Sequence, residues 1–307
     1  MTEPPVTVTV GGREISLSNL NKVLWPATGF TKGQLIDYYS RVAPVMVPHL
    51  SGRALTLKRY PNGVAAASFF EKNCPKHRPP WVPTAEMGEV GYCLAEEAAT
   101  LVWMANLAAI ELHPTLGRVP ALDQPTCVVF DLDPGPPADV LTCARVGLIL
   151  HDLFDQMGLQ AYVKTSGSKG LQLYLPIAGG SDFERTKSWC QALAKLLERT
   201  HPDLVVSVQD KSKRPGKVLL DWGQNAPSKT TVSVYSVRAR DEPTVSTPVT
   251  WEEVESALNS GDAGELRFLP DEVLDRIATR GDLMAPVLEG GQELPDLQGP
   301  AAPRLDA

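Results

Sequence analysis

The 307-residue sequence lacks the patterns that mark membrane, secreted and disulfide-stabilised proteins. It has no run of about 18 apolar residues, so we expect no transmembrane helix and no membrane partner. Its amino terminus has no basic start followed by an apolar stretch, which argues against a secretory signal peptide. The five cysteines include no Cys-x-x-Cys pair, and their odd number argues against a disulfide framework and favours a reducing compartment. We therefore expect a cytoplasmic protein.

Negative charge predominates, but it is concentrated near one end of the chain. The net charge is −7, whereas residues 1–240 carry +4 and residues 241–307 carry −11. Within 209–240, seven lysines and arginines accompany only two acidic residues. The overall acidity therefore does not exclude a nucleic-acid partner, and the segment 209–240 is either a positive binding surface or a solvated charged face.

Hydrophobic periodicity predicts helices and strands that are interspersed along the chain. Helical spacing is found at 31–48, 94–113, 137–158, 182–201, 250–259 and 270–280. Thr31 is the expected cap of the first helix, and Pro44 is expected to disturb its later turns. Strand patterns are found in VTVTV, CVVFDLD, AYVKTS, LQLYLPI, LVVSV, KVLLDW and VSVYSV. This order predicts a mixed α/β or α+β fold, followed by an acidic, disordered tail at 286–307.

Two aspartates end the apolar strand CVVFDLD. Side chains two residues apart on a strand point to one face, roughly 7 Å apart along it, so Asp131 and Asp133 project together. Two neighbouring anions are costly unless they are compensated, for example by a divalent cation. Asp221 closes a second apolar strand in KVLLDWGQN. If these strands are neighbours, the three carboxylates form an oxygen ligand set for two Mg²⁺ or Mn²⁺ ions, as in phosphoryl-transfer chemistry.

The same aspartates also have a structural interpretation. Asp133 begins an Asp-Pro-Gly turn, and Asp221 can cap the polar turn that follows it. A structural role explains Asp133 taken alone, whereas the occurrence of all three carboxylates favours the metal site.

The segment KTSGSKGLQLYL places serine, glycine and lysine between two strands. Backbone N–H groups around the glycines can form an anion nest, and Lys169 adds a positive charge suited to phosphate. The G-x-x-x-x-G-K-[ST] spacing of a Walker A loop is absent, and a strand rather than a helix follows. The segment is therefore either a triphosphate cradle that includes Ser166 and Lys169, or a Gly-Ser hairpin turn.

Other cationic residues lie at the ends of predicted elements. Lys58 and Arg59 end a strand, His113 closes the predicted helix 94–113, and Arg238 follows VSVYSV. Each has a structural explanation when taken alone, such as the interaction of a histidine with a helix dipole.

Two further groups lie in the amino-terminal part of the chain. Asn19, Lys22 and Lys32 bracket the start of helix 31–48, where cations beside helix N–H groups can hold a phosphate. Phe69 and Phe70, in ASFFEKN, either fill the core or offer a stacking face for a base. Strand periodicity predicts that one of the two rings points inward.

Seven blocks of sequence together resemble one protein family. They are SNLNKVLWPATGFTKGQ, TLKRYPNG, FFEKN, VVFDLDPG, TSGSKGLQLY, KVLLDWGQN and SKTTVSVYSVRAR. Over roughly residues 15–285 they resemble the polymerase domain of bacterial ATP-dependent DNA ligase D, of the archaeo-eukaryotic primase superfamily. The resemblance implies a primase-like α+β core at 1–285 with an RRM-like antiparallel sheet flanked by helices. Its subregions would be 1–120, with DNA 5′-phosphate-binding elements, the catalytic sheet at 121–240 and C-terminal helices at 241–285.

The resemblance also implies roles for individual residues. It makes Asp131, Asp133 and Asp221 the ligands of two Mn²⁺ or Mg²⁺ ions. The residues around the incoming nucleotide would be Lys58, His113, Ser166, Lys169, Gln224 and Arg238. The downstream 5′-phosphate would be held by Asn19, Lys22 and Lys32, and the stacking wedge would be Phe69 and Phe70. Thr115 is a departure, because family members often carry a tryptophan there.

The implied activity is metal-dependent, template-directed nucleotidyl transfer from NTPs or dNTPs, with ribonucleotides favoured, during non-homologous end joining. The implied partners are gapped, nicked or end-joined duplex DNA with a 5′-phosphate, together with Ku and a separate DNA ligase. No Lys-x-Asp-Gly nucleotidyl-lysine motif is present. This fits either a stand-alone polymerase or an excised domain of a larger protein.

Two other functions stay open at the level of the sequence. The run VVFDLD also resembles the nucleophile motif of haloacid-dehalogenase-type phosphatases, although Pro134 and Gly135 replace the residues that usually follow it. Alternatively, Lys22 and Lys32 hold a 5′-phosphate in a non-catalytic module that binds DNA ends.

Overall fold

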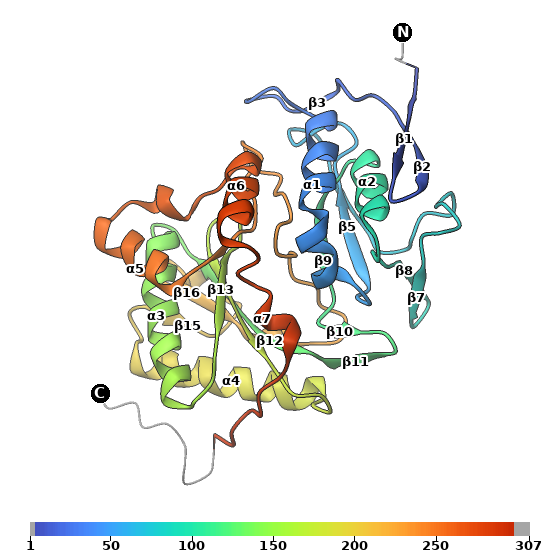
Figure 1. Cartoon of the computed structure of the whole chain (residues 1–307). Coiled ribbons are helices and arrows are strands. Elements are labelled where there is room, and N and C mark those ends of the chain that lie inside the picture. Colours follow the sequence, from blue (N-terminus) through green and yellow to red (C-terminus); the bar gives the residue numbers. More distant parts are fainter. Residues whose placement is uncertain (1–3, 298–307) are drawn as a thin grey trace. The chain divides into compact units, whose positions relative to one another are not determined.

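The computed structural model describes residues 4–297, which divide into two compact units (Figure 1). Unit 1 contains residues 4–122, 230–246 and 268–282, and unit 2 contains residues 123–229, 247–267 and 283–297. The sequence predicted three consecutive subregions instead. The difference arises because 230–246 and 268–282 pack with the amino-terminal part of the chain, although they come after the predicted catalytic sheet in the sequence.

Unit 1 is built on an antiparallel sheet in which β6, β5, β8 and β7 are neighbours and β9 also pairs with β5. These strands are β5 (Leu55–Arg59), β6 (Phe69–Glu71), β7 (Thr84–Met87), β8 (Val90–Cys93) and β9 (Ala109–Pro114). The two-stranded pairs are β1 (Val6–Val10) with β2 (Arg13–Leu17), β3 (Val23–Trp25) with β4 (Phe30–Thr31), and β10 (Gly117–Arg118) with β11 (Ala121–Pro125). The β1–β2 hairpin confirms the strand expected at VTVTV.

The helix α1 (Lys32–Leu50) begins where the sequence predicts. The Thr31 hydroxyl accepts a hydrogen bond from the Gln34 N–H, and the Gln34 side chain accepts one from the Thr31 N–H. The helix continues through Pro44 instead of being disturbed there. Val42 and Met46 are buried on either side of Pro44, so packing compensates for the lost backbone hydrogen bond.

The predicted helix over 94–113 is shorter than expected and is followed by a strand. The helix α2 covers Ala98–Asn106, and β9 follows after a turn in which Ala108 has φ 56°. His113 therefore lies on a strand and not at the C-terminus of a helix. The sequence prediction was wrong because a fully buried apolar run has the same pattern in a helix and in a buried strand.

Unit 2 contains a six-stranded sheet in the order β15-β16-β12-β14-β13-β17. The strands are β12 (Cys127–Pro134), β13 (Tyr162–Thr165), β14 (Leu171–Pro176), β15 (Val205–Val206), β16 (Val218–Asp221) and β17 (Pro248–Val249). Neighbouring strands are antiparallel except for β15 and β16, which are parallel. The strand-like segment VSVYSV forms no strand, because Tyr235 turns the chain at φ 64° and Val237 makes only an isolated bridge.

The order of elements in unit 2 confirms the expected α+β fold. Along the chain, β12, α3 (Val140–Gln156), β13, β14, α4 (Phe183–Thr200) and β16 follow one another, while β16, β12, β14 and β13 are neighbours in the sheet. This is the split β-α-β arrangement of RRM-like sheets.

The helices α3 and α4 cover one face of this sheet. The ring centroid of Phe130 in β12 lies 5.6 Å from that of Phe154 in α3 and 6.1 Å from that of Trp189 in α4. Because side chains alternate along a strand, Asp131 and Asp133 project from the opposite face. Burial on one side and polarity on the other thus place the carboxylates away from the helices.

The C-terminal part of the described chain is more ordered than expected. The helices are α5 (Trp251–Ser260) in unit 2, α6 (Pro270–Arg280) in unit 1 and α7 (Pro286–Glu289), with 3₁₀ turns η1 (Lys211–Lys213), η2 (Trp222–Gln224) and η3 (Ala263–Leu266). Within the predicted tail, Gln292 bridges to Ile177 and Leu294 is buried. These contacts hold 286–297 against unit 2, and the rest of the predicted tail, 298–307, lies outside the described residues.

Two cysteines pair, contrary to the expectation of free thiols. Cys74 and Cys93 form a disulfide with Cα atoms 4.8 Å apart, whereas Cys127, Cys143 and Cys190 are buried thiols. The Cys74 N–H donates to the Gly91 carbonyl and brings the loop after β6 against β8, a contact that cysteine spacing does not reveal. Among the helices of residues 4–297, none is long and apolar enough to cross a membrane.

Candidate active site

The predicted carboxylates lie on neighbouring strands in unit 2. Asp131 in β12 is directly opposite Asp221 in β16, and Asp133 lies two residues further along β12, opposite Leu219. Residues that are paired across antiparallel strands share a face, so Asp131 and Asp221 project together. The two strands are thus neighbours, which is the condition that the predicted carboxylate site required.

A row of polar side chains extends from Asp131 across the sheet. Gln172 in β14 is opposite Asp131, and Lys164 in β13 is opposite Gln172. The Gln172 amide donates to Oδ1 of Asp131 over 3.1 Å, and the buried Lys164 ammonium donates to the Gln172 carbonyl oxygen over 2.5 Å. The sequence analysis missed both residues. Each could have been noticed as a polar side chain that interrupts a short, mostly apolar strand pattern.

The ionised form of the Asp131 carboxyl group is unfavourable in this arrangement. Burial raises the pKa of its carboxyl group to about 6, and the charges of Asp221 and Asp133 act in the same direction. The hydrogen bond from Gln172 and the charge of Lys164 lower the pKa and only partly offset these effects. The site therefore favours any positive charge that approaches Asp131.

The other two carboxylates also have protein partners. Nη1 of Arg214 lies 3.3 Å from Oδ2 of Asp133. Oδ1 of Asp221 accepts from the Gly223 N–H over 2.9 Å, and Oδ2 accepts from the Gln224 side-chain amide over 3.0 Å. Asp221 thus caps the turn after β16, as its structural interpretation predicted, and the same contact brings Gln224 to the predicted metal site.

The donor chemistry of the three aspartates fits a divalent cation. Carboxylate oxygens are the ligands that Mg²⁺ and Mn²⁺ prefer, and burial, with the charges of Asp221 and Asp133, makes an uncompensated Asp131 carboxylate unfavourable. Within residues 4–297, however, no three His, Cys, Asp or Glu side chains are gathered closely enough to bind one ion. The assignment of Asp131, Asp133 and Asp221 as metal ligands stays a prediction.

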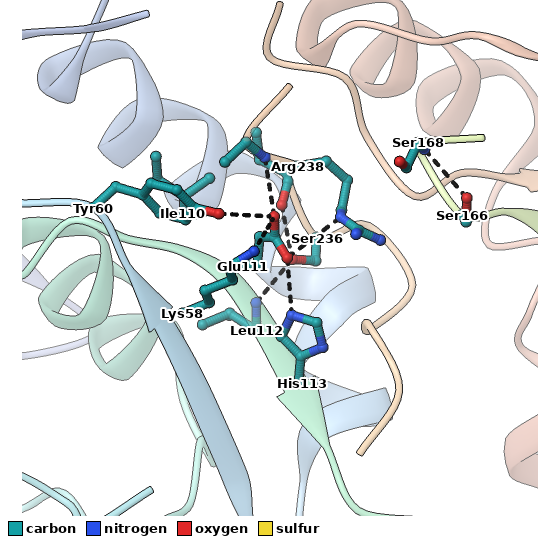
Figure 2. A network of polar contacts seen from close by, with 12 residues as sticks. Lys58, Tyr60, Ile110, Glu111, Leu112, His113, Ser166, Ser168, Ser236 and Arg238 are labelled. Carbon is teal, nitrogen blue, oxygen red and sulfur yellow. Dashed lines mark hydrogen bonds and ion pairs between the residues drawn. The ribbon is translucent and has the colours of Figure 1, made fainter. Parts of the chain in front are cut away.

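The turn at 166–170 joins β13 to β14 and packs against β12. Ser166 Oγ accepts from the N–H group of Ser168 over 3.2 Å (Figure 2) and from that of Gly170 over 3.1 Å, so these two groups are used within the turn. A Cβ atom added to Gly170 would lie 1.9 Å from the Leu132 carbonyl oxygen. This close approach places the turn that carries Ser166 and Lys169 beside the strand that carries Asp131 and Asp133.

A second group of predicted residues meets around a buried carboxylate in unit 1 (Figure 2). Oε2 of Glu111 lies 3.0 Å from Nε2 of His113 and 3.5 Å from Nε of Arg238, and Oε1 lies 3.8 Å from Nζ of Lys58. We call these four residues the Glu111 cluster. It unites three of the residues assigned to the nucleotide, whereas Glu111 itself was missed. Glu111 could have been noticed in the sequence, because it lies two residues before His113 and therefore on the same face of an apolar strand, as Asp131 and Asp133 do.

The charges in the Glu111 cluster stabilise one another. Burial alone would raise the pKa of Glu111, but the hydrogen bond from His113 and the charges of Arg238, His113 and Lys58 lower it to about 2. Burial lowers the pKa of His113, with the charges of Arg238 and Lys58 adding to the effect, despite the opposing interaction with Glu111. An ionised carboxylate can only accept hydrogen bonds, so with Glu111 ionised it is Nε2 of His113 that donates to Oε2 of Glu111.

Both aromatic residues of ASFFEKN are exposed. Phe69 is 46% exposed and Phe70 is 59% exposed, so the expectation that one ring points inward was wrong. In β6, a short edge strand, each ring lies against a cation of β5 instead of the core: Arg59 over Phe69 and Lys58 over Phe70, both at 5.3 Å. Phe70 also contacts His113 edge-on, with ring centroids 6.0 Å apart. The two rings are accessible for stacking, as their predicted role requires.

The three residues predicted to hold a 5′-phosphate lie together around the start of α1. The Lys22 N–H donates to the Asn19 carbonyl over 3.1 Å, and the Lys32 N–H donates to the Lys22 carbonyl over 2.8 Å. Nζ of Lys32 donates to the Ser18 carbonyl over 2.6 Å, next to Asn19. Burial, with the charge of Lys22, lowers the pKa of Lys32 to about 8. The proximity of the two lysines favours an anion between them.

The family comparison covers most of the chain. Residues 31–284 match the family model described as LigD, primase-polymerase domain. The multifunctional non-homologous end joining protein LigD of Mycolicibacterium smegmatis is 42% identical over 279 residues, which cover 89% of this chain and 36% of that protein. The bifunctional non-homologous end joining protein LigD of Bacillus subtilis is 32% identical over 269 residues, which cover 87% of this chain and 43% of that protein. The chain spans less than half the length of these relatives.

A solved structure gives the same result. The polymerase domain from Mycobacterium tuberculosis ligase D, solved in complex with DNA, matches with a TM-score of 0.83 and 39% sequence identity. The match covers 91% of this chain and 99% of that domain. With the extent of the family-model match, this shows that the chain belongs to the LigD primase-polymerase domain family.

Proposed function

We propose that the chain is a template-directed nucleotidyltransferase that extends primers and fills gaps in DNA. The observation that carries the proposal is the pairing of Asp131 with Asp221 on neighbouring strands, beside the turn 166–170. Carboxylates that repel one another, next to a turn containing Ser166 and Lys169, suit a triphosphate bound with divalent metal ions. Family membership supports the same activity.

In the proposed reaction, the oxygen of a primer 3′-hydroxyl forms a bond to the α-phosphorus of a nucleoside triphosphate. The bond from that phosphorus to the bridging oxygen of the β-phosphate breaks, pyrophosphate leaves, and the hydroxyl proton passes to solvent. Asp131, Asp133 and Asp221 would hold two Mn²⁺ or Mg²⁺ ions, which favour deprotonation of the hydroxyl and stabilise charge on the phosphates. The three predicted nucleotide-binding residues of unit 2 are Ser166, Lys169 and Gln224.

In unit 2, Gln172 and Lys164 would maintain the geometry of Asp131. Gln172 occupies Oδ1 of Asp131 with its amide, and its own carbonyl is fixed by the Lys164 ammonium. This leaves Asp131 held in one orientation on a rigid strand. Because Asp131 is already held in this orientation, less rearrangement is needed when substrate binds.

We further propose that the DNA is a gapped, nicked or end-joined duplex with a 5′-phosphate bound by Asn19, Lys22 and Lys32. The names of the relatives, which refer to non-homologous end joining, and the DNA-bound solved domain support this substrate. A preference for ribonucleotides, and cooperation with Ku and a separate DNA ligase, are further parts of the proposal. The family assignment gives no support to the haloacid-dehalogenase alternative.

Primer extension across a short gap tests the proposal. With Mn²⁺ or Mg²⁺ present, we expect Asp131→Asn to lower template-directed incorporation by at least about 100-fold, as expected when a charge-stabilising group is removed. The matched control is Asp152→Asn, which changes an exposed aspartate on α3. If the parent protein binds gapped DNA but incorporates no nucleotide with either metal, the end-binding module is the better account.

A further inference from the structure

Glu111 has no place in the proposed reaction, yet all three nucleotide-assigned residues of unit 1 converge on it (Figure 2). It is one of the most buried charged residues of the described chain, at 3% exposure. A buried carboxylate beside a predicted site for an anionic substrate is unfavourable by simple electrostatics. A functional role for Glu111 would account for this unfavourable placement.

The contacts of Glu111 join three separate parts of unit 1. Oε1 faces Lys58 of β5 and accepts from the Ala239 N–H over 3.2 Å and the Tyr60 hydroxyl over 3.4 Å. Oε2 accepts from His113 of the same strand and faces Arg238 of the segment 230–246. One carboxylate thus links strands β5 and β9 to a segment more than a hundred residues away in sequence.

The side chains of the Glu111 cluster differ in how far they are exposed to solvent. The Glu111 side chain is 4% exposed, whereas those of Arg238 and Lys58 are 17% and 25% exposed. The carboxylate is therefore innermost, and the cations lie between it and the solvent. A substrate that approaches this surface meets the cations, while Glu111 fixes their positions from beneath.

We propose that Glu111 is a positioning residue, which holds Lys58, His113 and Arg238 in the one arrangement that receives an incoming nucleotide. This inference rests on the proposed function. Lys58 shows how such positioning works: its ammonium lies 5.4 Å from the Tyr60 ring and 5.3 Å from the Phe70 ring, with Glu111 on the adjacent strand. A flexible side chain that is held from three directions loses less conformational entropy when it binds a phosphate.

The Glu111→Gln variant separates positioning from simple electrostatics, because the two predict effects of opposite sign. If Glu111 merely repels the anionic nucleotide, its neutralisation lowers the nucleotide Kd. If Glu111 positions the cations, neutralisation raises the Kd and the KM. We expect an increase of about 10- to 100-fold, the scale of effect found when a residue that orients a ligand-binding side chain is replaced. The kcat at saturating nucleotide should change little, because the chemical groups remain.

The matched control is Glu71→Gln. Glu71 forms an ion pair with Arg59 over 2.9 Å on the same sheet, so this variant also removes a carboxylate from a partly buried pair. It leaves the Glu111 cluster intact, and the KM for nucleotide should stay at the parent value. Nucleotide binding by calorimetry, gap-filling kinetics and thermal unfolding are measured on all three proteins.

A double-mutant cycle distinguishes an effect that Glu111 transmits through Lys58 from a general structural effect of Glu111→Gln. Lys58→Gln removes one positioned cation and raises the KM by itself. If Glu111 acts through Lys58, the combined variant raises the KM by less than the product of the two single effects. An unchanged or lower KM in Glu111→Gln, or fully multiplicative effects in the cycle, overturns the inference. A parent protein that incorporates no nucleotide overturns the proposed function instead.

Discussion

At the scale of single residues, Asp131 lowers the stability of the folded chain in the absence of a cation. Burial and two neighbouring aspartates raise the pKa of its carboxyl group from 3.8 to about 6. The folded state therefore disfavours the ionised form. This destabilisation develops as the pH rises above the unfolded pKa and is complete above the folded pKa of about 6.

Asp131→Asn should accordingly stabilise the metal-free protein while it removes activity. At about pH 8, we expect an increase in the free energy of unfolding of about 1–3 kcal/mol, from the shift in pKa at 1.36 kcal/mol per unit. The gain should shrink as the pH approaches 4, where the parent carboxyl group is protonated. Urea unfolding with a chelator present measures this, with Asp152→Asn as the control. A loss of stability at pH 8 would contradict the charge distribution described for unit 2.

The pair of Lys22 and Lys32 at the start of α1 gives a second prediction at this scale. Lys22→Gln should weaken binding of gapped DNA with a 5′-phosphate by about 10-fold, the scale of one hydrogen bond to a charged group. Binding of the same gap with a 5′-hydroxyl should change less. Because the pKa of Lys32 is about 8, the preference of the parent protein for 5′-phosphate should fall as the pH rises from about 7 to about 9.

Fluorescence anisotropy with the two DNA ends checks this prediction. Lys195→Gln, which removes an exposed lysine of α4, is the control for loss of general positive charge. Equal weakening on both DNA ends would reduce Lys22 to a general backbone contact.

At the scale of elements, strand alternation predicted more of the site than helix periodicity did. The alternation in CVVFDLD gave the shared face of Asp131 and Asp133 correctly, whereas the pairing of this strand with the one that ends at Asp221 was only a condition of the predicted site. The same alternation, read in LQLYLPI, could also have identified Gln172. Glu111 was missed because the run 94–113 was interpreted as one helix, and a helix does not place Glu111 and His113 on one face.

Other element-level features depend on contacts that no local pattern contains. Ala108 adopts a left-handed backbone conformation, which is uncommon for alanine and is not indicated by the sequence. The turn at this residue separates α2 from β9. The disulfide between Cys74 and Cys93 depends on the packing of a loop against β8. The edge position of β6 in its sheet likewise depends on strand pairing that the sequence does not show, so the exposure of both Phe69 and Phe70 could not be inferred.

Gly170 is the element-level position most sensitive to substitution. A Cβ atom there would meet the Leu132 carbonyl oxygen at 1.9 Å, and backbone cannot move aside as a flexible side chain can. Gly170→Ala should therefore separate the turn 166–170 from β12, lowering both stability, by about 1–3 kcal/mol or more, and gap filling. Gly179→Ala is the control, since a Cβ atom at Gly179 meets nothing within 4 Å. Parent-like unfolding of Gly170→Ala would show that the turn does not rest on β12.

At the scale of the whole molecule, the two units each carry a part of the predicted chemistry. Unit 2 contains Asp131, Asp133 and Asp221 on an RRM-like sheet, and unit 1 contains the Glu111 cluster and the lysine pair at the start of α1. The sequence predicted the members of these groups except Glu111, but it could not predict that 230–246 returns to unit 1. That return brings Arg238 to Glu111, and it depends on packing between segments far apart in the chain.

The most direct test of the central claim is the filling of a one-nucleotide gap whose templating base is varied. The parent protein, with Mn²⁺ or Mg²⁺, should insert the complementary nucleotide at each templating base and release pyrophosphate. Asp221→Asn should bind the same DNA with parent affinity and insert at least about 100-fold more slowly. Insertion that ignores the templating base, or that proceeds at the parent rate in Asp221→Asn, would contradict the assignment of this chain as a template-directed nucleotidyltransferase.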